Sequence, residues 1–457
     1  MEDKKDRVVW FWRFVIFAVI AGVCSVLIVV CSGFSGAKNL ADLFGTGTFL
    51  RSETVFLTVI FALLLPVVLI AITLYILKQG RGYIWNGKKH RRKEKESDGK
   101  RFRALCTIDE TAFSHATLGE TEIPPLFKIC ADFRRFAASK LHLYYEEEDI
   151  RRFIAGFAVS RLMIMQGLSG TGKTSLATAF GEFLGNPSTV ISVQPMWKER
   201  ADVIGYFNEF TKQFTESQLL KKLYEACYSD DIHIIVLDEM NIARVEYYFA
   251  DFLSLMELSP DSRYLEITSD RWEKDPALLE SGRLRLPDNV WFIGTANNDD
   301  STFAISDKVY DRAMVMNLDT KAKPFSAKYN GVEKMSFASF RHTTEWVKQT
   351  FIMTSRNRRK MLEIDRYLMD NYHITYGNRI RKQMEEYVAV YIACGGTEEN
   401  ALDDFLVKKV LRKLEGQNPI VVSKARKGLL QKLDELFGID SMPLCRNYLH
   451  FLSQSVS

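Results

Sequence analysis

The clearest chemical pattern is a glycine-rich loop that reads G-L-S-G-T-G-K-T from Gly167 to Thr174. It follows an apolar run at 162–165 and precedes a helix-like segment at 175–184, which is the setting of a phosphate-binding loop. Glycines let backbone N–H groups surround phosphates at a helix N-terminus, and Lys173 is expected to reach the β- and γ-phosphates. The predicted nucleotide-binding residues of this loop are Gly167, Ser169, Gly170, Thr171, Gly172, Lys173, Thr174 and Ser175.

A second pattern is an apolar strand-like run at 232–237 that ends in Asp238 and Glu239. Asp238, together with Thr174, is predicted to hold Mg²⁺, because ligands of open α/β sheets collect at the carboxyl ends of strands. Glu239 is then placed to orient and deprotonate an attacking water. The alternative is that the acidic pair forms only a solvated turn.

Two further candidates lie downstream. The apolar run 290–295 leads to Asn297, whose amide can hydrogen-bond a γ-phosphate or the lytic water. Arg312 is predicted to act as an arginine finger on the γ-phosphate of a neighbouring subunit. A surface salt bridge is the alternative for Arg312.

These residues need a parallel sheet to bring them together. Strand-like runs at 162–166, 189–193, 232–237 and 290–295 alternate with helix-like segments, which predicts an α/β domain. From about residue 336 onward the pattern is helix after helix. The predicted organisation is an α/β nucleotide-binding core at 153–320 and a helical C-terminal subdomain at 321–457, preceded at 80–152 by a basic juxtamembrane linker and helical lead-in.

The N-terminal part, 1–79, is predicted to be a membrane anchor. Two apolar runs, at about 10–32 and 55–77, are long enough to cross a bilayer as a transmembrane helical hairpin. Basic residues flank the hairpin on its outer ends, which predicts a multi-pass protein of the cell membrane with both termini in the cytoplasm. A cleavable signal peptide, or two buried core helices, are the alternative interpretations. The flanking cations are Lys4, Lys5, Arg7, Lys78, Arg81, Lys88, Lys89, Arg91, Arg92 and Lys93.

Composition limits the other functions. The formal net charge of +4 on 457 residues gives no strongly basic face, so nucleic-acid binding is neither indicated nor excluded. The seven cysteines lack C-x-x-C or zinc-type spacing, which predicts reduced thiols and no metal site made by protein ligands alone. His233 falls inside a strand-like run, where a structural role is favoured.

Four segments together resemble the AAA+ NTPases, within the branch of the McrB-type GTP-dependent motors and MoxR-type chaperones. They are GLSGTGKTS, IIVLDEMNIARVEYYFADFLSLME, the stretch LEITSDRWEKDP leading to RLRLPDNVWFIGTANND, and DKVYDRA. The resemblance covers about 153–451. It implies a homo-oligomeric ring, usually a hexamer, with active sites between subunits and Arg312 acting in trans.

The resemblance also implies a nucleotide-contacting arginine from the helical subdomain, for which Arg379 is the candidate and Arg381 the weaker one. In McrB-like proteins an asparagine with an aspartate three residues later accompanies guanine nucleotides, and Asn297 and Asp300 have this spacing. The neighbouring residues depart from that pattern, so ATP is the expected nucleotide and GTP the alternative. The segment 194–200 is similar to one that can face the central pore, although its Trp197 can equally pack against the core.

Three functions remain open from the sequence. The first is a membrane-anchored enzyme that hydrolyses ATP to remodel a partner protein or complex, and the resemblance places it in a bacterial defence or stress system. The second is a McrB-like GTP-dependent nucleic-acid motor working with a separate nuclease. The third is a nucleotide-gated membrane scaffold or effector with little hydrolysis. The expected partners are the lipid bilayer, further copies of the chain and an unidentified protein.

Overall fold

The computed structural model describes residues 100–112, 123–297, 302–319, 322–329, 331, 335–417 and 419–454. Contacts divide the chain into Met1–Asp98 and Gly99–Ser457, and the description below concerns the second unit. The two predicted membrane spans, 10–32 and 55–77, lie outside the described residues. Within the described part, no helix has the length and apolar character needed to cross a membrane.

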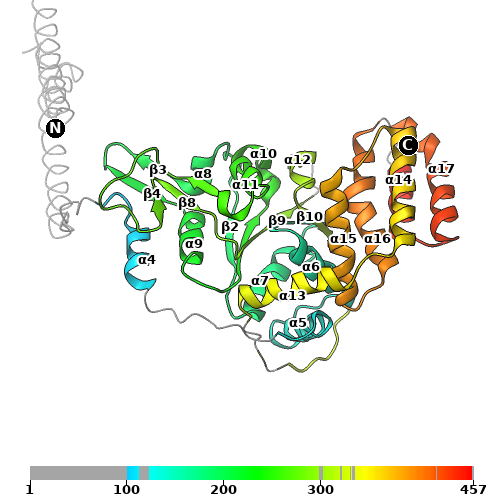
Figure 1. Ribbon diagram of the computed structural model, residues 1–457, viewed down its shortest axis with the longest axis horizontal. Coiled ribbons are helices and arrows are strands. Elements are labelled where there is room, and N and C mark those ends of the chain that lie inside the picture. Colours follow the sequence, from blue (N-terminus) through cyan, green and yellow to red (C-terminus); the bar gives the residue numbers. More distant parts are fainter. Residues whose placement is uncertain are drawn as a thin grey trace, which may run out of the picture. The chain divides into compact units, whose positions relative to one another are not determined.

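The centre of the fold is a five-stranded parallel sheet in the order β10-β1-β9-β5-β2 (Figure 1). Four of its strands coincide with the predicted runs, so the prediction of a parallel α/β core is confirmed. The β10 strand was not foreseen. The strands are β1 (Leu162–Gln166), β2 (Thr189–Ser192), β5 (His233–Asp238), β9 (Val290–Ala296) and β10 (Met314–Asn317).

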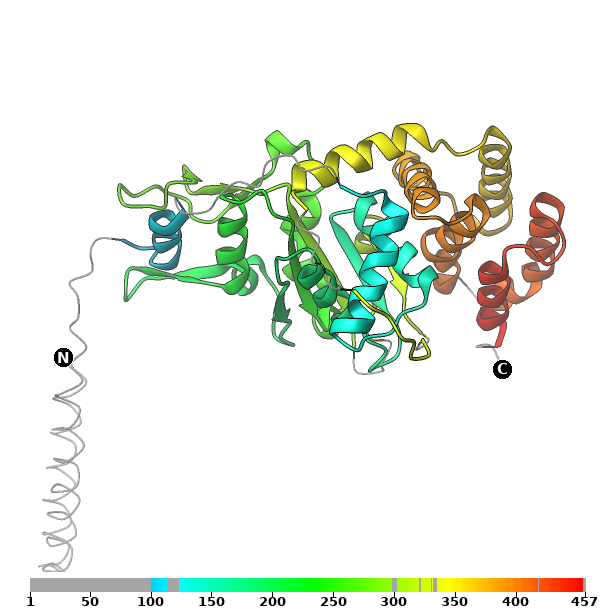
Figure 2. The same cartoon turned by 90° about the horizontal axis from the view of Figure 1, so that it is seen from below.

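Both faces of the sheet are buried, because successive side chains of each strand point to opposite sides. On β1, Met163 belongs to one hydrophobic cluster and Ile164 to the other. The first face is covered by helices α5 (Leu126–Lys140), α6 (Glu147–Val159) and α7 (Lys173–Phe183), visible beside the sheet in Figure 2. Helices α9 (Gln218–Ala226), α10 (Val245–Tyr248) and α11 (Ala250–Leu255) contribute to the second face.

Aromatic packing draws α5 and α6 into the core. The Phe157 ring stacks on Trp291 of β9 with centroids 4.4 Å apart, and the indole Nε1–H donates to the Phe157 carbonyl at 2.8 Å. Phe133 of α5 contacts Phe153 and Phe180 in the same cluster. The folded core therefore includes helices that lie before the predicted start of the core at residue 153.

The beginning of the described chain is also fixed to the second face. Arg101 is almost fully buried, and its guanidinium makes ion pairs to Asp270 at 2.7 Å and Asp275 at 2.6 Å. Phe102 stacks on Phe214, and helix α4 (Ala104–Ala112) packs against α9. The segment from Arg101 to Ala112 is therefore part of the folded unit, although it falls within the range predicted to be a linker and helical lead-in.

Two small antiparallel sheets project from the core. One is the hairpin of β3 (Gly205–Asn208) and β4 (Gln213–Glu216). The other has the order β6-β8-β7 and comprises β6 (Tyr264–Glu266), β7 (Leu279–Glu280) and β8 (Arg283–Arg285). Arg101 binds the loop between β6 and β7, so its ion pairs connect the second sheet to the start of the unit.

The C-terminal part is helical, as predicted. Its helices are α13 (Phe337–Thr350), α14 (Ser355–Tyr372), α15 (Asn378–Ala393), α16 (Glu398–Phe405), α17 (Pro419–Phe437) and α18 (Pro443–Gln454). A π-helical turn, η4 (Leu406–Val410), and a 3₁₀ segment, η5 (Leu411–Gly416), follow α16 directly. The buried carboxylate of Asp404 pairs with Arg152 of α6 and Lys408 of η4 and accepts from the Tyr387 hydroxyl, which connects this helical part to the core.

His233, at the start of β5, is a structural histidine, and burial lowers its pKa to about 4. Its Nδ1 faces the side-chain amide of Asn186 at 3.3 Å, and its Nε2 is buried without a partner among the described residues. A protonated ring would leave both N–H groups unsatisfied. The neutral ring is therefore the form that the fold accepts.

We expect His233 to make stability depend on pH. The unfolded-state pKa is about 6.5 and the folded value is lower, so the unfolded chain binds more protons between about pH 4 and 6.5. The contribution is present above this window, and up to about 3 kcal/mol is lost as the pH falls through it. Urea unfolding followed by tryptophan fluorescence at several pH values should show a smaller pH slope for His233→Gln than for the natural chain. Equal slopes would contradict this assignment.

Candidate nucleotide-binding and hydrolysis site

Three of the predicted catalytic residues, Lys173, Glu239 and Asn297, lie at one edge of the sheet. The phosphate-binding loop follows β1, Asp238 is the last residue of β5, and Asn297 directly follows β9. Because these strands are parallel neighbours in the sheet, their carboxyl ends lie side by side. The topology therefore brings together residues that lie in three well-separated parts of the sequence.

The loop has the backbone geometry that the glycine spacing predicts. Gly167 has φ of 139°, and a Cβ there would lie 2.4 Å from the Leu318 carbonyl oxygen, so only glycine fits. Gly172, with φ of 94°, directly precedes helix α7. Ser169 and Gly170 are exposed at the tip, and the helix N-terminus opens toward them.

Lys173, the first residue of α7, folds back into the loop. Its Nζ donates to the carbonyl oxygens of Gly167 and Leu168, both at 2.8 Å, and the side chain is buried. The ammonium group is thus held at the centre of the ring of backbone that would surround phosphates. From this position it can exchange carbonyl partners for phosphate oxygens.

Thr174 and Asp238 form the oxygen pair predicted for magnesium. The Thr174 hydroxyl donates to Asp238 Oδ1 at 2.7 Å, which brings one hydroxyl and one carboxylate from different elements to the same point. Hydroxyl, carboxylate and phosphate oxygens are the hard ligands that Mg²⁺ prefers, and it usually keeps several waters. The donor set therefore fits a magnesium ion bound together with nucleotide phosphates.

Thr295 was not foreseen as part of this site. Its hydroxyl donates to Asp238 Oδ1 at 2.8 Å and accepts from the backbone N–H of Glu239 at 2.9 Å. It thereby fixes both members of the acidic pair from the neighbouring strand. The available signal was a single hydroxyl residue near the end of the otherwise apolar run 290–296.

Glu239 is exposed, and its backbone lies in the left-handed region at φ 53° and ψ 47°. This conformation is uncommon for a residue with a side chain, and such positions cluster at functional sites. Two residues later, Asn241 is buried and its Nδ2 donates to the carbonyl of Asn297 at 2.9 Å. Asn241 therefore links the turn at Glu239 to the backbone of Asn297. The sequence did not indicate this contact. Asp300, of the spacing associated with guanine nucleotides, lies outside the described residues.

Arg312 lies at the opposite edge of the sheet. It precedes β10 by two residues, and Met314 of β10 pairs with Met163 near the start of β1. Its carbonyl accepts a hydrogen bond from Ser160 at 3.0 Å, just before β1. Since the phosphate-binding loop follows the other end of β1, the Arg312 side chain is separated from the loop of its own chain by the length of the strand.

Arg379 is beside Arg312 and away from its own phosphate-binding loop. Glu257 Oε1 pairs with Arg312 Nε at 2.8 Å and with Arg379 Nη1 at 2.5 Å. The structure thus brings the two predicted arginines together through one carboxylate and does not bring either to the carboxyl edge. Arg381 is exposed and contacts Asn378 of its own helix.

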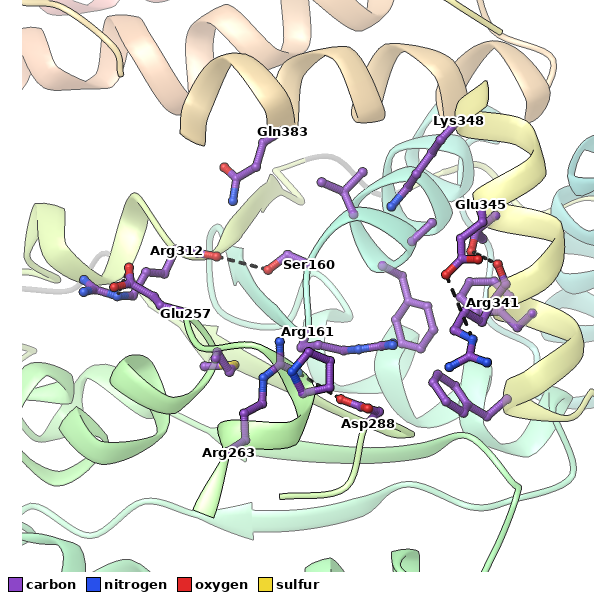
Figure 3. A pocket seen from close by; sticks show the side chains of 18 of the residues that line it. Ser160, Arg161, Glu257, Arg263, Asp288, Arg312, Arg341, Glu345, Lys348 and Gln383 are labelled. Atoms are coloured by element: carbon purple, nitrogen blue, oxygen red, sulfur yellow. Dashed lines mark hydrogen bonds and ion pairs between the residues drawn. The ribbon is translucent and has the colours of Figure 1, made fainter. Parts of the chain in front are cut away.

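Arg312 and Arg379 line a cavity of about 680 Å³ at the amino edge of the sheet. Figure 3 shows this cavity with Arg312 labelled. The cavity is rich in positive charge. Its lining contains the cations Arg161, Arg263, Arg312, Arg341, Lys348 and Arg379 and the acids Glu257, Asp288 and Glu345. Arg161 lies over the Trp291 ring at 3.6 Å, and burial is the main cause that lowers its pKa to about 9. The surplus of cations suits an anionic group presented from outside the chain.

A second cavity, of about 1050 Å³, lies at the carboxyl edge between the core and the C-terminal helices. Gln166, Leu168 and Asn297 line it from the core, and Arg412 and Tyr448 line it from the helical part. Two cations of the helical part, Arg412 and Lys408, line this cavity, whereas Arg379 lines the cavity at the amino edge. Neither was indicated by the sequence.

Trp197 packs in the core of its own chain. Its ring contacts Tyr248 with centroids 5.5 Å apart, while the neighbouring Met196 is exposed. Of the two sequence interpretations of this segment, the structure therefore supports core packing for the tryptophan.

Comparison with known proteins agrees with this geometry. Residues 162–313 match the AAA domain of the dynein-related subfamily, and residues 331–456 match a domain of unknown function (DUF8727). No curated protein matches the chain. Among solved structures, the chain is similar to a full-length MCM homolog from Methanopyrus kandleri. The alignment has a TM-score of 0.34 and 8% sequence identity, and it covers 64% of each chain. The chain therefore spans just under two thirds of that structure.

The loop, the acidic strand end and the matched region define the class of this domain. Residues 162–313 form a P-loop nucleoside triphosphatase domain of the AAA+ type, followed by a helical region. Domains of this class bind a nucleoside triphosphate together with magnesium. Neither family match extends to the McrB or MoxR branch, which stays a prediction.

Replacing Thr295 by valine tests the site directly. Valine keeps the shape but removes the hydrogen bonds to Asp238 and to the Glu239 N–H, so both acids lose their orientation. We expect steady-state turnover to fall roughly 10- to 100-fold, while equilibrium binding of a fluorescent nucleotide changes little. Thr295→Ser, which keeps the hydroxyl, should retain most of the turnover. Unchanged turnover in the valine variant would show that the contact is only structural.

Proposed function

We propose that this protein is a membrane-anchored AAA+ NTPase that hydrolyses ATP and uses the cycle to remodel a partner protein or complex. The observation that carries the proposal is the division of the site between two edges of one sheet. Lys173, Thr174, Asp238 and Glu239 occupy the carboxyl edge, whereas Arg312 occupies the amino edge. A complete site then needs the carboxyl edge of one copy and the amino edge of another.

Each residue has a separate task in this scheme. Lys173 and the loop N–H groups hold the β- and γ-phosphates, and bound Mg²⁺ would neutralise phosphate charge beside Thr174 and Asp238. Glu239 accepts the proton of the attacking water, and Asn297 orients that water or the γ-phosphate. Arg312 of a second copy stabilises the charge that develops on the transferred phosphoryl group.

The amino-edge cavity supports assembly into a ring. Cations outnumber acids in its lining, and a neighbour's triphosphate is the anion that the family arrangement would bring there. In this arrangement Arg379 joins Arg312 in the neighbour's site. A hexamer is the size that the resemblance favours, and the expected partner of each copy is another copy of the same chain.

Remodelling needs a moving part and a contact surface. The large cavity between the core and the C-terminal helices lies where bound nucleotide would change the angle between the two parts. The β3–β4 hairpin carries Phe210 at its tip, 99% exposed, with Tyr206 also exposed. We propose that these two aromatic side chains contact the partner.

The membrane anchor and the defence setting rest on the sequence. The apolar runs 10–32 and 55–77 support a location in the cell membrane, and the McrB-like resemblance supports a bacterial defence system. The McrB-like GTP-dependent motor is the second candidate, and the spacing of Asn297 and Asp300 favours it. A scaffold with little hydrolysis is opposed by the intact set of Lys173, Asp238 and Glu239.

Side-by-side hydrolysis of ATP and GTP by the detergent-purified protein tests the function. We expect ATP turnover per subunit to rise with protein concentration, because each site is completed by assembly, and Lys173→Ala to remove it. A clear preference for GTP would instead support the motor, and DNA binding at varied salt would then be measured. Turnover of neither nucleotide under assembling conditions would count against the enzymatic proposal.

The trans role of Arg312 has its own test. Arg312→Ala is expected to reduce turnover on the order of 10³-fold with nucleotide binding intact. Mixing it with Glu239→Gln should restore turnover, because the Gln variant supplies an intact Arg312 to the intact phosphate-binding loop of the Ala variant. If Arg312→Ala alone hydrolyses at the normal rate, the arginine acts only as a surface ion-pair partner.

A further inference from the structure

The short segment that carries Arg312 is held by the C-terminal helical part. The segment consists of α12 (Asp307–Tyr310) and the turn that leads to β10. Lys409, in the π-helical turn η4, donates from Nζ to the carbonyl oxygens of Tyr310 at 2.7 Å, Asp311 at 3.3 Å and Ala313 at 2.7 Å. These three carbonyls surround Arg312 in the sequence.

Two of the three contacts, those to Tyr310 and Asp311, satisfy the end of helix α12, and the third holds the turn that follows it. The last carbonyl groups of a helix have no partner within it, and a cation at this end also interacts favourably with the helix dipole. Lys409 is 3% exposed, so these hydrogen bonds are made away from solvent. Burial is the main cause that lowers the pKa of Lys409 to about 7, and Asp311 opposes this effect. The backbone of the turn is thus fixed by a side chain from another part of the fold.

Two neighbours of Lys409 hold the same segment. Arg412 pairs with Asp307 and lies over the Tyr310 ring at 3.4 Å, and Lys413 pairs with Asp311 at 3.4 Å. Three cations of η4 and η5 therefore contact one segment, 307–313. Of the three, only Lys409 is fully buried and only Lys409 contacts the turn through several carbonyls.

The segment is also in contact with the nucleotide edge of its own chain. The hydroxyl of Tyr310 accepts a hydrogen bond from Gln166, the residue directly before the phosphate-binding loop. Arg412 and Tyr310 both line the cavity at that edge. The segment that carries Arg312 thus contacts both the residue before the phosphate-binding loop of its own chain and the helical part.

We propose that Lys409 is a positioning residue for Arg312, and that through it the helical part of one subunit sets the placement of the arginine presented to the next subunit. This inference rests on the trans role of Arg312 proposed above. A shift of η4 when nucleotide enters the cavity moves the carbonyls that Lys409 holds, and Arg312 moves with them. π-Helical turns occur frequently at functional sites, and here the turn buries two consecutive lysines that face different partners.

Lys409→Met tests the inference, because it removes the three hydrogen bonds and leaves the phosphate-binding loop untouched. We expect turnover of the full-length protein to fall on the order of 10²-fold, since a small misplacement of a catalytic group costs about this much. Binding of a fluorescent ATP analogue should stay within about twofold of the natural value. Lys409→Arg, which keeps hydrogen-bond donors, should retain more activity than the Met variant.

Mixing experiments separate a misplaced arginine from a general defect. Lys409→Met mixed with Glu239→Gln should recover turnover, because the Gln variant supplies a correctly placed Arg312. Lys409→Met mixed with Arg312→Ala should not recover, since both lack a working arginine. Lys360→Met is the matched control. Lys360 is also a buried lysine of the helical part, but its ammonium group lies over the Phe437 ring and does not contact the segment with Arg312. We expect the Lys360→Met variant to hydrolyse nucleotide without mixing.

Each outcome has a distinct meaning. Turnover at the natural rate in Lys409→Met overturns the positioning role. So does a loss of turnover that mixing with Glu239→Gln does not reverse, when the same mixing does reverse the loss in Arg312→Ala. Normal turnover in Arg312→Ala overturns the trans role itself and the inference with it. If Lys409→Met does not fold, Lys409→Gln leaves a polar group beside the carbonyls but is too short to reach all three, and the same mixing results are required of it.

Discussion

The parallel pairing of β1 with β9 and β10 is the constraint on which the arrangement of this molecule depends. Parallel strands place all their carboxyl ends at one edge and all their amino ends at the other. The phosphate-binding loop and Asp238 follow strand ends, whereas Arg312 precedes a strand start. One chain therefore keeps Arg312 and the phosphate-binding loop at opposite edges of the sheet, which is the geometric basis of the proposed association of copies.

Aromatic packing gives this sheet its rigidity. Phe157, Phe180 and Trp291 fill the first face with stacked and edge-to-face contacts, which add to the free energy gained from burying their area. On the second face Phe249 and Phe252 pack against Phe292. Because both faces are filled, the strand ends are held in fixed positions. The hydrogen bonds among Thr174, Asp238 and Thr295 are therefore already formed before nucleotide binds.

Patterns that depend on local chemistry were predictable from the sequence. Four of the strands follow from short-range rules and are confirmed. The structure places the glycine-rich loop and the acidic pair at strand ends, and their roles in binding and hydrolysis stay predictions. Thr295, Asn241 and Lys409 could not be found this way, because their roles come from contacts between distant segments. A threonine or lysine in an apolar stretch gives no information about the partner that will satisfy it. The packing of α5 and α6 on the sheet could not be predicted for the same reason. Their aromatic residues indicate burial but not the surface against which they pack.

The distribution of buried charge shows how the helical part is attached to the core. Lys408 and Lys409 are adjacent and both buried, which is costly unless each finds partners. Lys408 shares Asp404 with Arg152 of α6, so this contact fixes η4 to the core through opposite charges. The hydrogen bonds that Lys409 makes to the described residues go to backbone carbonyls, which fix the direction of the turn. Lys408 and Lys409 are consecutive residues of the same π turn, yet their ammonium groups meet different partners. Lys408 attaches the turn to the core, and Lys409 holds the backbone on either side of Arg312.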